Sequence, residues 1–298
     1  MKLATFKLDG QSRLGVKVER GLIDVTASLE RSPESGVCTD IMEVIAGGEA
    51  TRASLEQYVK ELLAENKAVF ADEKAVEWEP CVTRPEKIIC VGLNYRKHAD
   101  ETNAPYPEVP ILFNKFNNTL AGHKSEIPVP AVTDKLDYEV ELGIVIGKQT
   151  KNVSKEQALD SVFGYCAVND LSARDLQFTT AQWMLGKISD KFSPTSPYVV
   201  TSDEVGDPQS LELKTYVNDE VRQDSNTEDM IFTCEEIVSY ISKHLTLNPG
   251  DLILTGTPEG VVLGLPEEEQ VYLKPGDVVT IEVEKVGQLT NTFVAERE

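Results

Sequence analysis

The sequence predicts an α+β protein on three observations. Along 137–146, carboxylates alternate with apolar residues at the two-residue period of a β-strand. Turn signals at Asp9-Gly10 and Asn218-Asp219 divide short strand-like runs in the manner of hairpins. Residues 51–70 and 233–245 instead repeat apolar residues at helical spacing, so the chain contains both kinds of element.

Two domains are expected, because Glu79-Pro80 and Arg84-Pro85 mark a boundary. A small N-terminal domain over 1–80 should contain short strands within 1–30 and helices over 39–46 and 51–70. A larger domain should cover 81–298. Its expected elements are strands over 87–92, 111–115, 137–146, 162–168, 252–254 and 278–281, a hairpin over 215–223 and a helix over 233–245.

Composition and charge exclude several classes of function. The 298-residue chain carries 29 Lys and Arg against 50 Asp and Glu, a net charge of −21, which argues against nucleic acid and membrane surfaces as partners. The five cysteines are scattered without a CxxC pair, as in a reducing compartment, so we expect a cytoplasmic protein. No run of about 18 apolar residues occurs, and neither export nor membrane insertion is expected.

Carboxylates stand side by side on the strand over 137–146. Asp137, Glu139 and Glu141 alternate with apolar residues and should therefore face one way. Like charges at this spacing require a cation between them, raised pKa values or full exposure to water. Exposure fits poorly, because the residues between and after them are too apolar for a surface edge. Hard divalent cations bind oxygen ligands, so Mg²⁺ or Mn²⁺ is expected here.

His98 and Glu101 form a second candidate group. In a helical turn they lie on one side, where the carboxylate orients the imidazole and raises its basicity; a chance pair on a surface helix is the alternative. The chain has three histidines, so few other side chains can act as a base near neutral pH. Pro105, Pro107 and Pro110 follow and resist regular structure, as expected of a mobile loop that acts as a lid.

Asp170 and Lys187 are candidates farther along the chain. The segment between Glu141 and Asp170 is long enough for a helical crossover that returns the chain beside the first strand, where Asp170 can complete a three-carboxylate site. The alternative role for Asp170 is the N-cap of a helix over 172–177. Lys187 is either a surface residue or a buried cation near an anionic substrate.

Several motifs, taken together and in this order, resemble those of the fumarylacetoacetate hydrolase superfamily. They are Val91-Gly92-Leu93-Asn94-Tyr95 with His98 and Glu101, Asp137-Tyr138-Glu139-Val140-Glu141-Leu142, Gly164-Tyr165 through Asn169-Asp170-Leu171-Ser172-Ala173-Arg174-Asp175-Leu176-Gln177, Gly186-Lys187, and Leu254-Thr255-Gly256-Thr257-Pro258-Glu259-Gly260-Val261. The resemblance covers most of residues 85–298 and extends to bacterial members described as 2-hydroxyhepta-2,4-diene-1,7-dioate isomerase-like. The specificity lies in the whole set, since no single motif is specific.

The resemblance implies a fold and a set of site residues. The fold is a mixed β-sandwich or β-roll with flanking helices and a small N-terminal α/β domain, usually in a homodimer. The metal is Mg²⁺ or Mn²⁺, and the lid carries a dyad that activates water. The residues implied are Glu139, Glu141 and Asp170 for the metal, His98, Glu101 and Lys187 for catalysis, and Asn94, Tyr95, Lys115, Gln177 and Thr257 for the substrate.

The resemblance also implies a reaction on a small oxo acid. We expect a metal-dependent hydrolase that cleaves a carbon–carbon bond in a 2,4-dioxo acid, an acylpyruvate or a fumarylacetoacetate-like compound, as in aromatic catabolism. Metal chelation by such an acid stabilises the enolate left when the bond breaks. The enzymatic alternatives are an oxaloacetate decarboxylase and a hydroxymuconate-type isomerase, and the other alternative is a catalytically inactive small-acid binding protein.

Two departures from the family pattern bear on the substrate. Leu93 stands where many members carry Arg or Lys, which removes an expected contact to a substrate anion. Phe116-Asn117-Asn118-Thr119 stands where members usually have Pro and Ser. The identity of the substrate is therefore not carried over.

Overall fold

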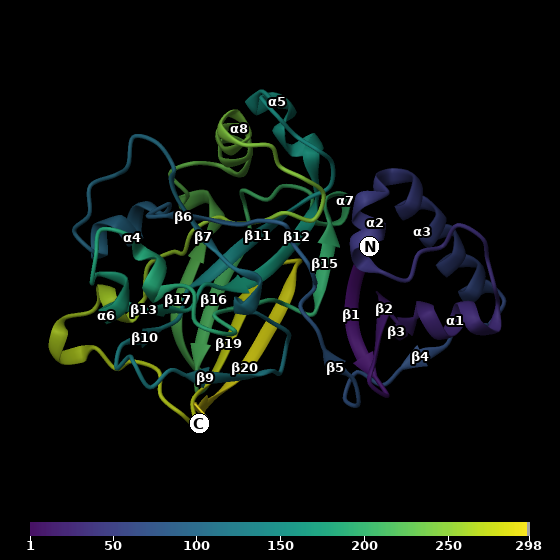
Figure 1. Ribbon diagram of the computed structural model, residues 1–298, viewed down its shortest axis with the longest axis horizontal. Coiled ribbons are helices and arrows are strands. Elements are labelled where there is room, and N and C mark those ends of the chain that lie inside the picture. Colours follow the sequence, from purple (N-terminus) through teal and green to yellow (C-terminus); the bar gives the residue numbers. More distant parts are fainter. Residues whose placement is uncertain (297–298) are drawn as a thin grey trace.

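Two β-sheets packed face to face form the body of the protein, whose computed structural model describes residues 1–296 (Figure 1). Within this range the larger sheet has eleven strands: β1 (Lys2–Leu8), β2 (Gln11–Val18), β3 (Gly21–Asp24), β4 (Phe70–Ala71), β5 (Glu77–Trp78), β6 (Ile88–Gly92), β7 (Ile111–Lys115), β11 (Val140–Ile146), β12 (Val162–Asn169), β15 (Tyr198–Thr201) and β18 (Leu252–Leu254). Their order is β4-β3-β2-β1-β15-β12-β11-β18-β6-β7, and β5 pairs with β1 outside this path.

The smaller sheet and two short strand pairs complete the β-structure. The smaller sheet contains β9 (Glu126–Val129), β16 (Glu212–Val217), β17 (Glu220–Asn226), β19 (Val278–Val283) and β20 (Gly287–Ala295). Their order is β17-β16-β19-β20-β9. The short pairs are β8 (Leu120–Ala121) with β14 (Ser193–Pro194), and β10 (Leu136–Asp137) with β13 (Ser172–Ala173).

Helices flank the sheets. The α-helices among residues 1–296 are α1 (Val25–Arg31), α2 (Ile41–Ala46), α3 (Gly48–Ala64), α4 (Arg96–Glu101), α5 (Lys155–Ala158), α6 (Arg174–Gln177), α7 (Ser202–Val205) and α8 (Cys234–His244). Short 3₁₀ turns are η1 (Asn117–Thr119), η2 (Leu159–Ser161), η3 (Trp183–Gly186), η4 (Thr227–Asp229), η5 (Val262–Gly264) and η6 (Glu267–Glu269). In this part of the chain every helix is too short or too polar to span a bilayer.

The main hydrophobic core lies between the two sheets. Leu142 of β11 and Tyr165 of β12 belong to the same buried cluster as Leu213 of β16 and Ile281 of β19. Helix α8 adds Ile237 to this cluster, as its apolar face predicted. The alternation of apolar residues on facing strands explains this packing, and the predicted mixed β-sandwich with flanking helices is confirmed.

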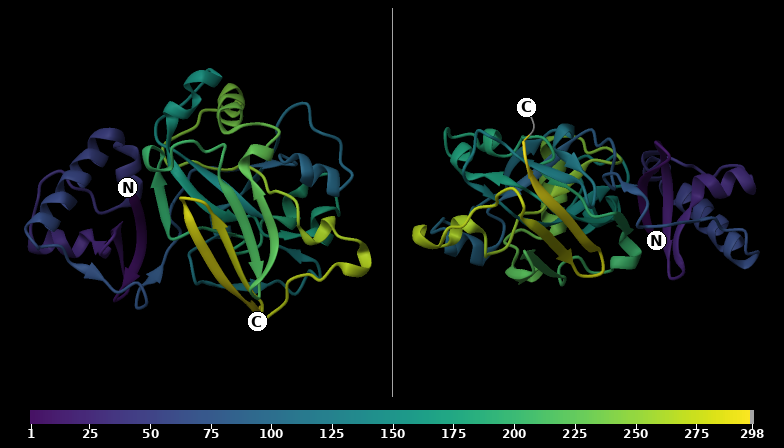
Figure 2. Two further views of the ribbon diagram at one scale, coloured as in Figure 1. Left: turned by 180° about the vertical axis from the view of Figure 1, so that it is seen from behind. Right: turned by 90° about the horizontal axis from the view of Figure 1, so that it is seen from below.

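The segment up to residue 80 forms one end of the larger sheet. Strand β1 pairs with β2 on one side and with β15, from the rest of the chain, on the other. Figures 1 and 2 show this segment, with α1, α2 and α3, at one end of the long axis. The larger sheet thus continues from the segment up to residue 80 into the rest of the chain. A domain border near residue 80 stays a prediction.

Strands β11 and β12 correct one expectation about chain direction. The predicted helical crossover would make them parallel, but they pair antiparallel, with Val140 opposite Asn169. The connection contains α5 and η2 and still returns as a hairpin. Antiparallel pairing places the start of β11 beside the end of β12, and the backbone amide of Asp170 donates to the carbonyl of Glu139 at 2.9 Å.

Candidate active site

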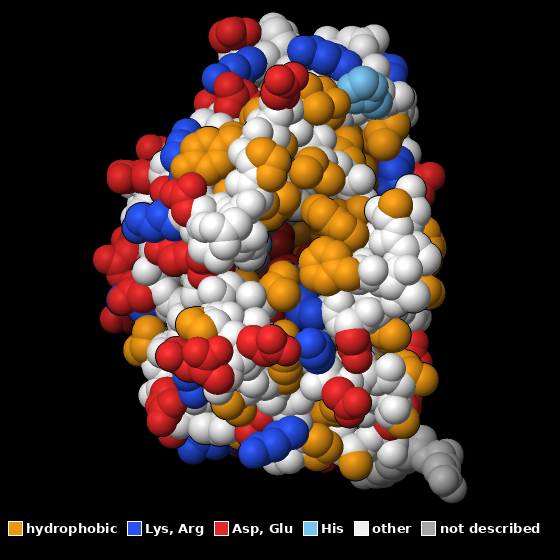
Figure 3. All heavy atoms as spheres, turned by 90° about the vertical axis from the view of Figure 1, so that its left-hand side faces the viewer, with side chains coloured by type: hydrophobic (Ala, Val, Ile, Leu, Met, Phe, Trp, Pro, Cys, Tyr) orange, Lys and Arg blue, Asp and Glu red, His pale blue; other side chains and the backbone are white. Residues whose placement is uncertain are grey.

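A cavity of about 610 Å³ lies among α4, α6 and η3 beside the start of β11. Figure 3 shows the hollow from outside, with acidic side chains in its depth and hydrophobic side chains around its mouth. Eight of the eleven predicted site residues line it: His98, Glu101, Glu139, Glu141, Asp170, Gln177, Lys187 and Thr257.

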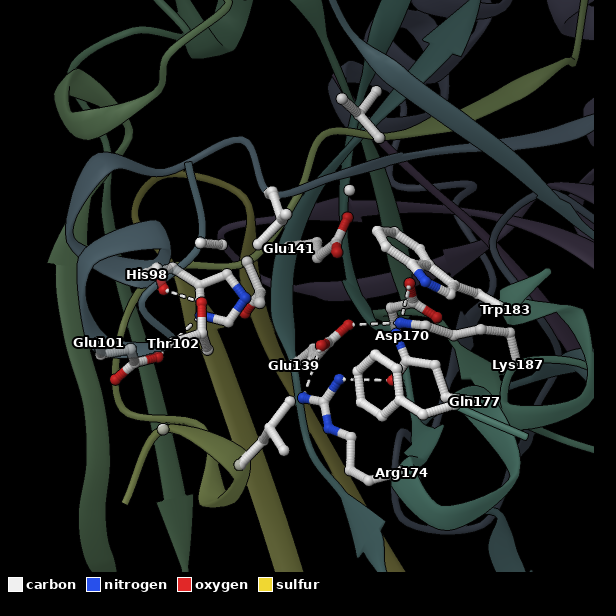
Figure 4. A pocket seen from close by; sticks show the side chains of 18 of the residues that line it. His98, Glu101, Thr102, Glu139, Glu141, Asp170, Arg174, Gln177, Trp183 and Lys187 are labelled. Atoms are coloured by element: carbon white, nitrogen blue, oxygen red, sulfur yellow. Dashed lines mark hydrogen bonds and ion pairs between the residues drawn. The ribbon is translucent and has the colours of Figure 1, made fainter. Parts of the chain in front are cut away.

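Glu139, Glu141 and Asp170 meet on the floor of the cavity (Figure 4). Each offers a carboxylate oxygen, and these atoms lie within 4.8 Å of one another. All three residues are buried, with at most 4% of their surface exposed. The antiparallel pairing described above brings Asp170 to the two glutamates, so the structure gathers the three residues predicted as metal ligands.

Asp137 is not part of this cluster, although it stands in the same predicted strand as Glu139 and Glu141. The predicted strand is interrupted, since β10 ends at Asp137 and β11 begins only at Val140. The Asp137 carboxylate instead accepts hydrogen bonds from the backbone amides of Val262 and Leu263 at 3.0 and 3.1 Å. It thus anchors the 262–263 turn, and its Oδ2 also accepts from Nε of the cavity-lining Arg174 at 2.8 Å.

Three buried cations accompany the carboxylates. Lys187 Nζ lies 2.7 Å from Oε2 of Glu139 and 2.9 Å from Oδ2 of Asp170. A terminal nitrogen of Arg174 lies 2.7 Å from Oε1 of Glu139, and Lys115 pairs with Oδ1 of Asp170. The structure therefore excludes the exposed alternative for these carboxylates and the surface alternative for Lys187, which is 2% exposed.

These charges shift the pKa values of neighbouring groups in opposite directions. Burial acts to raise the pKa of Glu139, but Lys187 and Arg174 outweigh it and lower this pKa to about 2. Burial raises the pKa of Glu141 well above its usual value, and Asp170 and Glu139 add to the rise. Burial acts to lower the pKa of Lys187, yet Asp170 and Glu139 raise it overall, so its ammonium group stays charged.

Glu141 is the carboxylate of the triad that makes no ion pair within residues 1–296. Its side chain accepts a hydrogen bond from the backbone amide of Gly256 at 2.7 Å. Only 2% of the surface of Glu141 is exposed. Burying a carboxylate without a counter-ion is costly. A divalent cation held by oxygen atoms of Glu139, Glu141 and Asp170 would remove this cost, so the residues present fit the expected metal.

His98 and Glu101 line the same cavity from α4. Nδ1 of His98 lies 2.7 Å from Oε1 of Glu101, and Oε2 of Glu101 accepts from the backbone amide of Gly260 at 2.9 Å. The pair is largely enclosed, with the His98 side chain 8% exposed, so it is not a chance pair on a surface helix. Figure 4 shows it across the cavity from Lys187. Because the Glu101 carboxylate accepts a hydrogen bond from Nδ1–H of His98, the neutral imidazole keeps a lone pair on Nε2.

Three residues expected to touch the substrate do not line the cavity. Asn94 is fully buried, and its side-chain amide donates to the carbonyl of Thr255 at 2.7 Å and accepts from the amide of Phe232 at 2.8 Å. Tyr95 is fully buried in the main core. The ammonium group of Lys115 pairs with Asp170 and donates to the carbonyl of residue 192 at 2.6 Å. In this structure, therefore, these three residues do not line the cavity.

Gln177 and Thr257 do line the cavity, and each is held by a residue that sequence reasoning missed. Arg174 Nη1 donates to Oε1 of Gln177 at 3.0 Å, and Gln223 Nε2 donates to Oγ1 of Thr257 at 2.9 Å. Arg174 stands in the same sequence motif as Gln177, and its place in that motif could have identified it as a site residue. Gln223 had none, because it comes from the distant hairpin of β16 and β17.

Comparison with known families decides the relationship. The family model described as fumarylacetoacetate (FAA) hydrolase C-terminal matches residues 87–294. The chain belongs to the fumarylacetoacetate hydrolase family. A relative named oxaloacetate tautomerase fahd2, mitochondrial, from Xenopus laevis is 40% identical over 286 residues, covering 95% of this chain and 86% of that protein. That name gives no support to a cytoplasmic location, which stays a prediction.

Solved structures of the family share the whole fold. A fumarylacetoacetate hydrolase from Exiguobacterium antarcticum superposes with a TM-score of 0.85 at 34% identity, covering 99% of this chain and all of that one. A maleylpyruvate hydrolase from Sphingobium sp. SYK-6, in complex with manganese(II) and pyruvate, gives a TM-score of 0.80 at 29% identity and covers both chains completely. The chain is thus related along its length to enzymes of this family, one of them solved with a metal ion bound.

Proposed function

We propose that the protein is a Mg²⁺- or Mn²⁺-dependent enzyme that moves a proton at C3 of small 2-oxo acids, with oxaloacetate as its first substrate. The observation that carries the proposal is the buried triad with its unpaired Glu141, which lies across one cavity from His98 and Glu101. The name of the Xenopus laevis relative, an oxaloacetate tautomerase, supports oxaloacetate.

Glu139, Glu141 and Asp170 would hold the ion. Bound there, a divalent ion polarises the keto oxygen of a 2-oxo acid and offsets the negative charge that develops on it. Lys187 adds a fixed positive charge beside the same carboxylates, because Asp170 and Glu139 keep its ammonium protonated. Both features favour the enolate over the keto form of the substrate.

His98 is the residue placed to move the proton. Glu101 holds the proton on Nδ1, so Nε2 accepts the proton from C3 of the keto acid. Return of that proton to the enolate oxygen completes conversion of keto to enol, and the reverse order converts enol to keto. Atoms and charge balance without a further reactant.

Hydrolysis of a 2,4-dioxo acid is a second candidate function, and the size of the cavity favours it. About 610 Å³ is within the range of cavities that enclose drug-sized ligands, and exceeds what a four-carbon acid needs. In this reaction Nε2 of His98 takes a proton from a water molecule whose oxygen adds to C4. The C3–C4 bond then breaks, its electrons pass to the enolate, and His98 returns the proton to C3.

Two assays on one preparation test both candidates. Chelated protein is reloaded with Mn²⁺, the enol–keto conversion of oxaloacetate is followed by ultraviolet absorbance, and cleavage of acetylpyruvate is followed by release of pyruvate. We expect oxaloacetate conversion to exceed the rate given by the same concentration of free Mn²⁺. Conversion no faster than with free Mn²⁺ would overturn the first function, and absence of pyruvate would overturn the second.

A homodimer, expected from the family resemblance, is the assembly we propose. Analytical ultracentrifugation at micromolar concentration measures it directly. A mass of twice the 32.9 kDa of one chain supports the proposal, and the mass of one chain contradicts it.

A further inference from the structure

The cavity has two unlike halves. The inner half contains the carboxylate triad with Lys187 and Arg174. The outer half is lined by Leu93, Phe113, Phe178, Trp183, Leu263 and Leu265. Figure 3 shows hydrophobic side chains grouped around the mouth of the hollow. A site for a four-carbon diacid alone has no use for such a wall.

The aromatic part of the wall is fixed by close packing. The Trp183 ring meets the Phe113 ring edge to face, with centroids 5.7 Å apart. A β-carbon at Gly92 would lie 2.3 Å from a ring carbon of Trp183, so glycine at this position makes room for the indole. The centroid of the Phe113 ring lies 5.1 Å from Lys187 Nζ. The aromatic wall is therefore directly beside the charged residues of the inner half.

Leu93 and Phe178 add to this wall at a cost in local stability. Leu93 has a φ of 50°, a left-handed conformation that bulky residues rarely adopt, and it lines the cavity where β6 ends. Phe178 follows α6 and is 56% exposed, a large apolar surface left at the mouth. An apolar ligand group placed there would bury both side chains.

Among the described residues, the outer half offers no cationic side chain to a negative charge, although the polar Thr102 and Asn103 also line the cavity. Among residues 1–296, the cationic side chains that line the cavity are Arg174 and Lys187. Arg174 is paired with Asp137 and Glu139, and Lys187 with Glu139 and Asp170. A carboxylate at the far end of a long substrate would lie against apolar walls without a counter-ion, which is unfavourable.

We propose that this outer half binds the uncharged, apolar tail of a 2-oxo acid longer than oxaloacetate, so that the site selects monocarboxylic acylpyruvates over acids with a second, distal carboxylate. The inference rests on the proposed function, because the 2-oxo acid end must lie at the triad for its tail to reach Phe113 and Trp183. Oxaloacetate is short enough to remain in the inner half.

Binding of three 2-oxo acids to the Mn²⁺-loaded protein, measured by calorimetry, tests the selectivity without requiring turnover. The probes are pyruvate, 2-oxohexanoate and its analogue with a terminal carboxylate, 2-oxohexanedioate. We expect 2-oxohexanoate to bind more tightly than pyruvate by roughly fourfold for each methylene that becomes buried. We expect 2-oxohexanedioate to bind at least about tenfold more weakly than 2-oxohexanoate. Equal affinity of the two six-carbon acids, or absence of binding, would overturn the inference.

Variants assign the selectivity to the wall. Trp183→Ala should reduce the preference for 2-oxohexanoate over pyruvate by about tenfold, whereas Met184→Ala, in the same 3₁₀ turn but outside the cavity, should leave it unchanged. Leu93→Arg should favour 2-oxohexanedioate, and Leu93→Met should not. Unaltered preference in both Trp183→Ala and Leu93→Arg would contradict the assignment.

The outcome is separable from that of the proposed function. If the two six-carbon acids differ in affinity as expected but neither oxaloacetate nor acetylpyruvate is converted, the reaction is wrong and the tail site stands. If substrates are converted but the two six-carbon acids bind equally, the tail site alone is wrong.

Discussion

Glu141 is oriented by the backbone amide of Gly256, which donates to its Oε2 at 2.7 Å. Gly256 has a φ of 99°, and a β-carbon there would lie 2.7 Å from Cβ of Asn94. Glycine therefore allows the loop after β18 to pack closely against Asn94, in the position from which its amide reaches the buried carboxylate. The glycine acts on the cavity floor although it is not one of its lining residues.

Gly256→Ala should weaken metal binding through this contact. The added methyl group pushes the loop away, so we expect the Kd for Mn²⁺ to rise by about tenfold or more. Gly276→Ala is the matched control, because Gly276 has the same φ of 99° but no atom within 4 Å of its β-position. Calorimetric titration of both variants makes the comparison. An equal loss of affinity in the two would mean that general backbone strain, not the Glu141 contact, is responsible.

Lys187→Met should lower kcat far more than it lowers metal affinity. Its ammonium group lies beside the oxygens of Glu139 and Asp170, where the proposed function requires it to stabilise developing negative charge, so a loss of about 100-fold is expected. Lys115→Met is the contrast, since Lys115 binds Asp170 from behind without lining the cavity. It should cost stability, about 3–5 kcal/mol, with a smaller effect on kcat. If Lys187→Met retains kcat within a factor of about two, Lys187 is only structural.

His98→Ala should abolish hydrolysis of acetylpyruvate and slow oxaloacetate conversion, because both need a base on Nε2. The expected loss is about 100-fold or more, and Glu101→Gln should reproduce part of it. Loss of carbon dioxide from oxaloacetate needs no attacking water, so it should persist in part. His244→Ala, at the exposed end of α8, is the control. Retained hydrolysis with an unchanged pH profile would remove His98 from the mechanism.

His123 should make the folded protein sensitive to mild acid. Burial, followed by the charge of Lys124, lowers the pKa of His123 to about 4, and its Nδ1 accepts from the amide of Thr290 at 3.1 Å. Because the folded-state pKa of His123 lies below the unfolded value of about 6.5, the neutral imidazole stabilises the folded protein above about pH 6.5. This stabilisation is lost as the pH falls towards 4. The loss is on the order of 2 kcal/mol after allowance for partial exposure.

Urea unfolding of metal-free protein at pH 7.5 and 4.5 measures this loss. His123→Asn should show a smaller difference between the two pH values than the wild type, and His244→Asn should match the wild type. His123 also packs against Trp78, with ring centroids 6.0 Å apart, so the measurement reports on the junction between the N-terminal segment and the rest of the chain. An unchanged difference in His123→Asn would exclude this histidine as the cause.

Local sequence pattern predicted the parts of the site that depend on local geometry. The i, i+3 spacing of His98 and Glu101 suffices, because α4 alone sets their separation. The alternation of Glu139 and Glu141 likewise carries into the start of β11. Asp137 lies outside the triad, since the chain leaves strand geometry at residues 138 and 139, and no propensity in the sequence signals that break.

Other parts of the site depend on packing that sequence pattern does not encode. The link from Glu141 to Asp170 has a length compatible with either strand direction, so the neighbour was predicted correctly and its direction was not. The side chain of Lys115 points away from the cavity because its ammonium group binds the carboxylate of Asp170 and the carbonyl of residue 192. The sequence pattern does not specify these partners. The apolar wall joins Phe113 and Trp183 from separate elements, and it became visible only in three dimensions.

Titration of metal-free wild type and Glu141→Gln with Mn²⁺, with oxaloacetate conversion measured in the same samples, tests most directly whether the triad holds an ion that activity requires. Wild type should bind one ion per chain, and its activity should rise in proportion to occupancy. Glu141→Gln should bind Mn²⁺ at least about 100-fold more weakly. It should nevertheless unfold without metal at the same or a higher temperature, since an uncharged amide replaces a buried carboxyl group whose ionisation is unfavourable. Full activity of exhaustively chelated wild type, or of Glu141→Gln, would contradict this account.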